Sequence, residues 1–481
     1  MTDRVRPYQY YDVAVSICSH CLRRVDAKIV FQDDSVWMLK RCPDHGAERV
    51  LLADDVTYWR MARERFLKPS EMPRRFQTPV RYGCPYDCGL CADHEQHSCL
   101  TLVELGDPCN LECPICYAGS GPAHTQWHSL ETIRGMLDTI VDSEGEPDIV
   151  QLSGGEPTLH PAFFEIVAEA KRRPIRHLML NTNGVRIAME DGFAERLASF
   201  APGFEIYLQF DSLREGPLRE LRGVDLREIR ARALERLNAL GLSTTLVVTV
   251  KKGTNDDELG SILAYALEQP CVRGVTFQPI QDAGRAQDFE ASTHRLTLTE
   301  DRRRILEQSD LFQEEDLLPV PCHPDAIAMG YALKTADGAL PLTRFVDPEL
   351  LLNAGGNTIR YEADGVLHQR LFEALSTAHG PESSAASLAS LLCCLPQVEL
   401  PADLPTIGYE NVFRVIVMQF LDAHSFDVRS VKKSCVHIVH PEDGRVIPFD
   451  TYNLFYRGTL ERDLLQPLRE AAGTRMETME P

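Results

Sequence analysis

The sequence contains no apolar run long enough to cross a bilayer. Its most apolar stretch, residues 412–421, is shorter than the hydrocarbon core and is interrupted by Arg414 and Gln419. The opening residues, MTDRVRPYQYYD, are polar and lack the apolar centre of a secretion signal. We therefore expect a soluble, cytoplasmic protein.

Basic residues are also in deficit, because 50 Lys and Arg stand against 71 Asp and Glu, for a formal net charge of −21. A field of that sign repels nucleic-acid phosphates and anionic membrane surfaces. Nucleic acid is thus an unfavoured partner, which counts against RNA modification. A small or uncharged substrate is favoured.

Cysteine, in contrast, is abundant. There are 15 cysteines, and ten of them fall between Cys18 and Cys116 at short, repeated spacings. In a large intracellular protein, such a concentration of thiols indicates metal binding rather than disulfides.

Short apolar runs alternate with amphipathic segments through the middle of the chain, which predicts repeated β-α units around a parallel sheet. The expected strands are residues 100–105, 148–153, 177–182, 205–210, 244–250 and 274–279, and the expected helices are 129–141, 163–172, 225–240 and 258–267. The pattern predicts an α/β fold with an incomplete barrel of the (β/α)6 type, because a closed eight-fold barrel would need two more units.

A cysteine loop follows the first of these strands, with the spacing Cys109-x3-Cys113-x2-Cys116. It lies at the carboxyl end of the strand, where active sites of barrel-like folds are found. Three thiolates can hold three irons of a [4Fe–4S] cluster and leave the fourth iron open for a ligand. The alternative is a structural zinc site, which would need a fourth ligand.

The second strand ends in Gly154, Gly155, Glu156 and Pro157. Glycines allow a ligand to approach the backbone closely, and a carboxylate can accept a hydrogen bond from an ammonium group.

The cysteine loop and this GGEP segment, on consecutive strands, resemble the radical S-adenosylmethionine (SAM) superfamily. The resemblance implies that the open iron chelates the amino and carboxylate groups of SAM and that GGEP contacts the methionine amino group. The ends of later strands resemble the family's ribose contacts more loosely. These further candidates are Asn181, Asn183, Gln209 and Asp211. Ile115 stands where the family often has an aromatic residue.

A second loop, Cys84-x3-Cys88-x2-Cys91, repeats the spacing earlier in the chain and is followed by Cys99. It has neither a preceding apolar strand nor a GGEP partner. We assign these four cysteines to an auxiliary [4Fe–4S] cluster, with structural zinc as the alternative. Such a cluster could pass electrons or bind substrate.

A third set, Cys18-x2-Cys21 and Cys42-x2-His45, has the spacing of a tetrahedral metal site. Zinc and a rubredoxin-like mononuclear iron are both compatible with it, and the histidine favours zinc. A purely structural role is the simpler interpretation.

Cys322 and Cys435 lie far apart in the sequence, and each has a histidine nearby, His323 and His437. A third site shared by these cysteines is an open alternative.

These motifs divide the chain into four expected regions. They are a Cys3His zinc or rubredoxin-like domain (1–80), an auxiliary-cluster segment (81–100), a radical SAM core (101–310) and an α+β extension that covers the active site (311–481). The whole arrangement resembles the branch that contains tetraether lipid synthase and proteins named as dihydro-hydroxymethylpterin methyltransferases. Several relatives have a cysteine where this chain has Asp450.

The resemblance implies reductive cleavage of SAM to a 5′-deoxyadenosyl radical, which abstracts hydrogen from an unactivated C–H bond. The electron would come from a flavodoxin- or ferredoxin-type reductant. Two reactions stay open: carbon–carbon coupling on a lipid-like chain, which we favour, and methyl or one-carbon transfer to a pterin-like molecule. An alternative of another class is a non-catalytic iron–sulfur or zinc scaffold for electron transfer.

Overall fold

The structure, a computed structural model, describes residues 6–65, 72–335, 338–341, 343 and 412–477. Its amino-terminal part is a four-stranded antiparallel sheet followed by one helix. These elements are β1 (Gln9–Ile17), β2 (Arg24–Gln32), β3 (Ser35–Cys42), β4 (Gly46–Ala53) and α1 (Val56–Glu64). Burial alternates along β2 and β3, as in a sheet with one face on a core.

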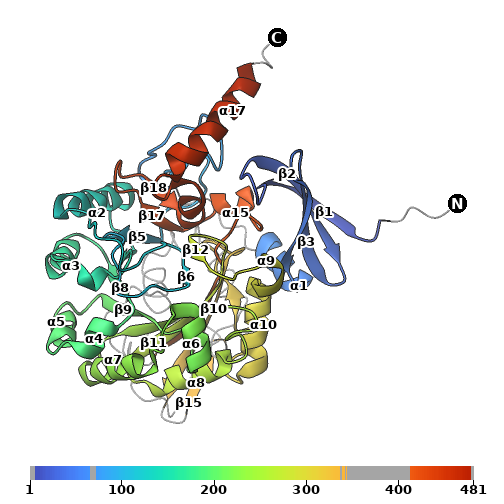
Figure 1. The fold of residues 1–481 in the computed structure, drawn as a ribbon. Helices are drawn as coiled ribbons and strands as arrows, with labels where there is room; N and C mark the ends of the chain where they lie inside the picture. The colour runs from blue at the N-terminus through green and yellow to red at the C-terminus, as the bar shows by residue number, and fades with distance from the viewer. Residues whose placement is uncertain (1–5, 66–71, 336–337, 342, 344–411, 478–481) are drawn as a thin grey trace, which may run out of the picture.

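The central sheet contains every strand expected from the sequence. These strands are β5 (Leu100–Glu104), β7 (Ile149–Ser153), β8 (His177–Thr182), β9 (Phe204–Gln209), β10 (Thr244–Val250) and β11 (Val272–Pro279). They pair in parallel in this order, so their carboxyl ends share one edge. Helices surround the sheet on its outer side (Figure 1). The partial (β/α)6 barrel is therefore confirmed.

The carboxyl-terminal region, expected as a cover over the active site, also extends this sheet at both edges. β17 (Val436–Val439) pairs in parallel with β5, and β16 (Val412–Met418) pairs in parallel with β11. Outside them lie the antiparallel strands β18 (Val446–Pro448) and β14 (Ile327–Thr335). The described strands run as an open path from β13 to β18.

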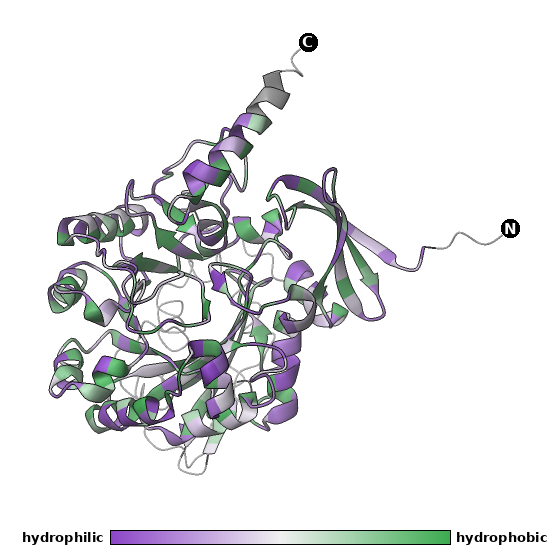
Figure 2. Cartoon of the chain, in the orientation of Figure 1, coloured by the Kyte–Doolittle hydropathy of each residue, from purple (hydrophilic) through white to green (hydrophobic). Residues whose placement is uncertain are grey.

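The outer helices are amphipathic. The longer ones are α2 (Leu130–Glu144), α3 (Phe163–Lys171), α7 (Arg227–Leu240), α8 (Leu259–Glu268) and α10 (Leu298–Gln308). The hydroxyl of Ser129 caps α2 by accepting from the backbone N–H of Thr132 at 3.1 Å. Ile133, Leu137 and Ile140 of this helix are fully buried against the sheet. Figure 2 shows hydrophobic and hydrophilic residues side by side on these helices, as expected for a single core-facing stripe.

Shorter elements complete the described chain. They are β6 (Ile115–Cys116), β12 (Arg285–Ala286), β13 (Leu318–Pro319), β15 (Gly338–Pro341), α4 (Val185–Met189), α5 (Phe193–Ala198), α6 (Glu215–Arg222), α9 (Ala291–His294), α15 (Val428–Lys432), α16 (Phe449–Thr451), α17 (Gln466–Glu477), η1 (Pro157–Leu159), η4 (Tyr452–Tyr456) and η5 (Glu461–Leu465). Across the part of the chain that the structure describes, no helix is both long and apolar enough to cross a membrane.

A buried lysine joins the amino-terminal sheet to the carboxyl-terminal region. The Lys40 ammonium group donates to the backbone carbonyls of Ile17, Ala423 and His424 at 2.8–2.9 Å. It also pairs with Glu48 at 3.3 Å. Because an unpaired buried ammonium group is costly, these acceptors fix how the two parts dock.

His424 of the carboxyl-terminal region contacts Glu48 of the amino-terminal sheet at 2.9 Å. We expect this contact between the two parts to weaken at high pH. Hydrogen bonds to the carboxylates of Asp282 and Glu48 raise the pKa of His424 to about 9. The stabilisation from a raised pKa is complete below the unfolded value, near 6.5, and is lost as the pH rises through about 9. Since the imidazole is partly exposed, we expect about 1–2 kcal/mol rather than the full shift.

Urea unfolding of the wild type and His424→Gln between about pH 6 and pH 10 measures this term. The stability difference between the two proteins should shrink with rising pH, whereas exposed His124→Gln should show no such trend. A difference that is independent of pH would contradict the expectation.

Candidate active site and metal sites

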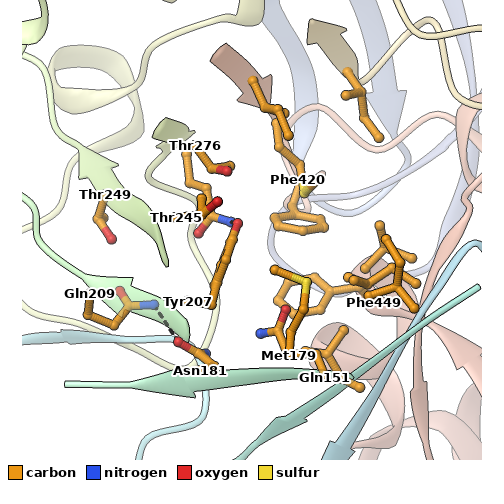
Figure 3. A pocket seen from close by; sticks show the side chains of 18 of the residues that line it. Gln151, Met179, Asn181, Tyr207, Gln209, Thr245, Thr249, Thr276, Phe420 and Phe449 are labelled. Carbon is orange, nitrogen blue, oxygen red and sulfur yellow. Dashed lines mark hydrogen bonds between the residues drawn. The ribbon is translucent and has the colours of Figure 1, made fainter. Parts of the chain in front are cut away.

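A cavity of about 790 Å³ lies within the barrel, and the cysteines of the loop after β5 line it. Its two sides differ in character (Figure 3). The hydroxyl groups of Thr245, Thr249 and Thr276 lie on one side. On the other side Phe420 and Phe449 stand with their ring centroids 4.0 Å apart. The cavity therefore offers hydrogen bonds on one wall and an aromatic surface on the other.

The loop that carries Cys109, Cys113 and Cys116 is held in place by hydrogen bonds to its backbone. The N–H of Cys109 donates to the carbonyl of Gly121 at 3.3 Å, and Arg285 donates to the carbonyls of Cys113 and Ser120 at 2.6 Å. Burial raises the pKa of the Cys109 thiol to about 12 and also raises that of Cys113. Free thiols here would stay neutral, whereas a metal deprotonates a coordinating thiol. This donor set fits a [4Fe–4S] cluster with one iron free of protein ligands.

The glycines of the GGEP segment let β7 approach this loop. The N–H of Gly155 donates to the carbonyl of Gly106 at 2.8 Å, and the N–H of Glu156 donates to that of Pro108 at 2.9 Å. A Cβ atom on Gly155 would lie 2.2 Å from the Pro108 oxygen, and one on Gly154 would lie 2.5 Å from the Gly106 oxygen. Gly154 also has a φ of +120°, which favours glycine. The two motifs are therefore in direct backbone contact.

The Glu156 residue lines the cavity, and its carboxylate accepts hydrogen bonds from neighbouring protein groups. Its expected contact with the ammonium group of the ligand stays a prediction. One oxygen accepts from the hydroxyls of Thr158 and Thr182 at 2.6 and 2.7 Å, and the other accepts from the N–H of Asn183 at 2.8 Å. Burial raises the pKa of Glu156 and these hydrogen bonds oppose the rise. The carboxylate thus fixes the end of β8, and Pro157 begins η1 behind it.

The polar residues at the ends of β7, β8 and β9 form a chain along the cavity. Asn181 donates to the Ser153 hydroxyl at 3.1 Å and accepts from Gln209 at 2.8 Å (Figure 3). Asn183 donates to Asn110 of the cysteine loop at 2.7 Å. The structure thus brings three of the four expected ribose-side residues to the cavity wall.

Asp211, the fourth, lies elsewhere. Its side chain is fully buried and accepts from Arg222 and Arg230 at 2.5–2.8 Å. It therefore anchors two arginines and does not line the cavity. Arg222 does line it, and its guanidinium opposes the rise that burial causes in the pKa of Cys113. The sequence gives no signal for Arg222, because only the folded chain brings the end of α6 to the cysteine loop.

The earlier loop, with Cys84, Cys88 and Cys91, packs against the carboxyl-terminal region. The N–H of Cys88 donates to the Tyr456 hydroxyl at 3.0 Å. Asp87 shapes the loop by accepting from the backbone N–H groups of 81–83. Burial raises the pKa of all three thiols, so they too suit a metal that deprotonates them.

Cys99 is placed differently from the expectation that it completes that loop. Its sulfur lies within 4.8 Å of the sulfurs of Cys322 and Cys435. The cause is the parallel pairing of β17 with β5, in which Val436 stands opposite Leu100 and therefore brings the residues before them together. The order of cysteines along the chain suggested the wrong partners, because this pairing joins distant segments.

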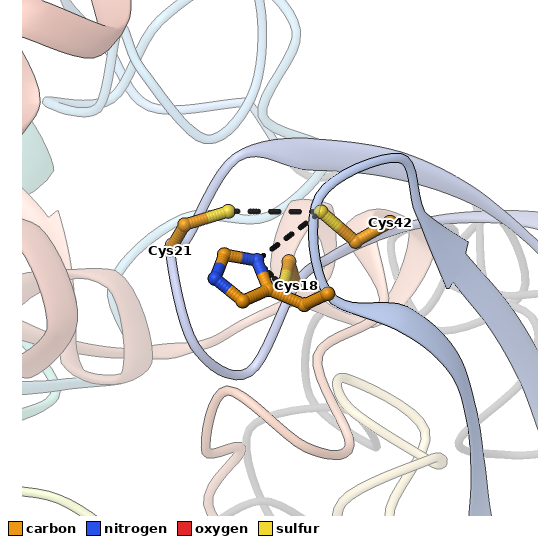
Figure 4. Close-up of side chains that lie close together, drawn as sticks. Cys18, Cys21 and Cys42 are labelled. Carbon is orange, nitrogen blue, oxygen red and sulfur yellow. Dashed lines mark hydrogen bonds between the residues drawn. The ribbon is translucent and has the colours of Figure 1, made fainter.

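The amino-terminal set gathers as its spacing predicts. The ligand atoms of Cys18, Cys21, Cys42 and His45 lie within 4.8 Å of one another (Figure 4). The His45 Nδ1 atom is 3.6 and 3.5 Å from the sulfurs of Cys18 and Cys42, and the sulfurs of Cys21 and Cys42 are 3.8 Å apart. Bonds of about 2.3 Å to one ion place tetrahedral sulfurs roughly 3.8 Å apart, so this set fits a single metal ion.

Comparison with known proteins agrees with these arrangements. Residues 103–266 match the Radical SAM superfamily, and residues 10–54 match the HMPTM N-terminal zinc ribbon domain. A 7,8-dihydro-6-hydroxymethylpterin dimethyltransferase of Methanocaldococcus jannaschii is 30% identical over 493 residues, covering 95% of this chain and 96% of the relative. Mycofactocin maturase MftC of Mycolicibacterium smegmatis is 28% identical over 196 residues, covering 41% and 48%. A GTP 3′,8-cyclase of Chlorobaculum tepidum is 30% identical over 205 residues, covering 40% and 59%.

The superfamily match contains both the cysteine loop and the GGEP segment, and the similarity to the first relative runs through nearly the whole chain. Membership implies a [4Fe–4S] cluster and SAM as cofactors. This chain belongs to the radical SAM superfamily of enzymes.

Proposed function

We propose that this enzyme transfers a methyl or other one-carbon group to a pterin-like heterocycle. The observation that carries the proposal is the 30% identity to a pterin dimethyltransferase along nearly the full length of both chains. From sequence this reaction was the alternative. The lipid-like chain that we favoured there stays a prediction without this support.

Most of the cavity lining is apolar, and the polar groups on part of it support a flat heterocycle as the substrate. A pterin is a bicyclic ring with donors and acceptors around its edge, and its faces can lie against aromatic rings. Gln151, Gln278 and Tyr207 line the cavity, and Gln278 donates to the Tyr207 hydroxyl at 3.3 Å. The edge of a pterin could form further hydrogen bonds with these side chains, each worth about 1 kcal/mol, whereas an acyl chain could form none.

The chain's own residues bind and orient the reactants. Cys109, Cys113 and Cys116 would hold the cluster, and the backbone of Gly154 and Gly155 would meet the methionine part of SAM. When bound, the reduced cluster and SAM would supply the chemistry of hydrogen-atom abstraction from a C–H bond. The barrel walls exclude water and align the target carbon.

The other metal sites have supporting roles in this proposal. Cys84, Cys88 and Cys91 would hold an auxiliary [4Fe–4S] cluster whose fourth position Cys99 does not fill. Cys18, Cys21, Cys42 and His45 would hold structural zinc, which the match to a zinc ribbon domain supports. A flavodoxin- or ferredoxin-type protein of the cytoplasm would supply the electron.

Anaerobic turnover with SAM, a chemical reductant and either a dihydropterin or a phospholipid tests the substrate. We expect 5′-deoxyadenosine formation to rise with the pterin, and the pterin to gain the mass of one CH2 unit, a methyl group in place of hydrogen, once a one-carbon donor is present. Gln278→Leu should raise KM for the pterin roughly tenfold, the equivalent of one hydrogen bond. Exposed Gln313→Leu is the matched control. Coupling to the phospholipid alone would contradict the proposal.

A further inference from the structure

We propose that Cys99, Cys322, Cys435 and His97 bind a further metal ion at the end of the cavity remote from the cysteine loop that binds SAM. The three sulfurs lie within 4.8 Å of one another, and all four side chains line the cavity. The proposal does not depend on the identity of the substrate.

Three separate segments of the chain meet at this site. Leu100, next to Cys99, donates its N–H to the carbonyl of Cys435 at 3.1 Å, at the start of the β5–β17 pair. Gln96 donates to the carbonyl of Cys322 at 3.2 Å. Backbone contacts therefore hold the sulfurs together, although two of the cysteines lie far from Cys99 in sequence.

The spacing of the three sulfurs matches that of the zinc ribbon set, whereas the His97 nitrogen lies near the Cys99 sulfur but outside the group of atoms that are all within 4.8 Å of one another. The sulfurs of Cys322 and Cys435 are 3.5 Å apart, and the His97 Nε2 atom is 3.6 Å from the Cys99 sulfur. In the zinc ribbon the corresponding separations are 3.8 Å between sulfurs and 3.5–3.6 Å between nitrogen and sulfur. A [4Fe–4S] cluster gives each cysteine its own iron and so spreads the sulfurs farther apart. The distances favour one thiophilic ion, zinc or iron.

A carboxylate orients the histidine. Glu144 accepts from the His97 Nδ1 atom at 2.9 Å, and its other oxygen accepts from the N–H of Ser98 at 3.0 Å. A proton on Nδ1 leaves the Nε2 lone pair for a metal, which is the usual carboxylate–histidine–metal arrangement. Glu144 is thus a positioning residue, and His97 supplies the nitrogen ligand.

The two histidines that the sequence placed beside these cysteines are engaged elsewhere. His323 is 3.0 Å from the Ser430 hydroxyl, and His437 is 3.1 Å from His94. The sequence left open a metal site shared by Cys322 and Cys435. The proposal keeps these two cysteines and joins them with Cys99 and His97. The site lies where β5 begins, whereas the loop with Cys109, Cys113 and Cys116 follows the end of β5. The two therefore occupy opposite ends of the cavity.

Metal and sulfide analysis of the full chain tests the proposal. The double variant with Cys322→Ala and Cys435→Ala should lose one zinc or iron and no sulfide. The control Cys271→Ala removes a buried core cysteine and should lose neither metal nor sulfide. Loss of roughly four irons together with sulfide would contradict a single ion and would indicate a cluster at these cysteines. Metal and sulfide contents equal to those of Cys271→Ala would overturn the proposal.

Alkylation of the wild-type protein covers the case in which the double variant fails to fold. Cys322, which is only partly buried, should be protected from iodoacetamide until a strong chelator is added, and protection that persists in stripped, folded protein would overturn the proposal. Glu144→Gln should weaken metal binding at this site roughly 10- to 100-fold, and His97→Ala should weaken it further. Exposed His124→Ala should leave it unchanged. Each of these readouts is independent of methyl transfer.

Discussion

Replacement of Cys109, Cys113 and Cys116 together by alanine is expected to abolish formation of 5′-deoxyadenosine from SAM. Their loop supplies the three protein ligands of the proposed catalytic cluster and lines the cavity. Enzymes accelerate reactions roughly 10⁶-fold or more, so loss of the centre should leave only background. Anaerobic turnover with SAM and a reductant, followed by chromatography of the nucleoside products, measures the effect.

The control is Cys271→Ala, which removes a buried cysteine from the hydrophobic core without touching a metal site. This variant should keep its activity. Continued 5′-deoxyadenosine formation in the triple variant would move the catalytic role to another loop, with the one at Cys84 as the first candidate.

The second large effect is expected from the single substitution Gly155→Ala. The added methyl carbon would lie 2.2 Å from the carbonyl oxygen of Pro108, a backbone atom that cannot swing away as a side chain can. Relief requires β7 and the cysteine loop to separate, which breaks the hydrogen bond from Gly155 to Gly106. A displacement of about 1 Å near reacting groups can cost roughly 100-fold in rate. We expect a loss of that size in SAM cleavage and weaker SAM binding, with the iron content unchanged.

Gly135→Ala is the matched control. This glycine lies inside α2, and a Cβ atom there would meet nothing within 4 Å. Because alanine favours helix, the control should be neutral or more stable by about 0.5–1 kcal/mol. Should both variants cleave SAM at the wild-type rate, the backbone contact between the two motifs would have no role in catalysis.

The sequence was a good guide to whatever depends on neighbouring residues. Strands such as β10 are buried on both faces and read as continuous apolar runs. The spacing of Cys18, Cys21, Cys42 and His45 is local to two turns, and the structure gathers these four ligands as expected.

Long-range pairing could not be predicted in the same way. β17 has only four residues and includes His437, so its apolar pattern is too short to recognise. Its pairing with β5 nevertheless decides the partners of Cys99. Asp211 follows the same rule, since its place was decided by Arg222 and Arg230, whose positions depend on how α6 and α7 pack.

The pairing of β17 with β5 also affects the nascent chain. β5 is among the earliest strands of the barrel to leave the ribosome, yet the strand that covers its free side is among the last. Until residues 436–439 emerge, an unsatisfied row of backbone N–H and C=O groups can recruit other polypeptides, as uncovered sheet margins do. A chain whose synthesis stops before that point therefore exposes this margin between Cys99 and Cys109, where aggregation and uncontrolled oxidation of the thiols would begin.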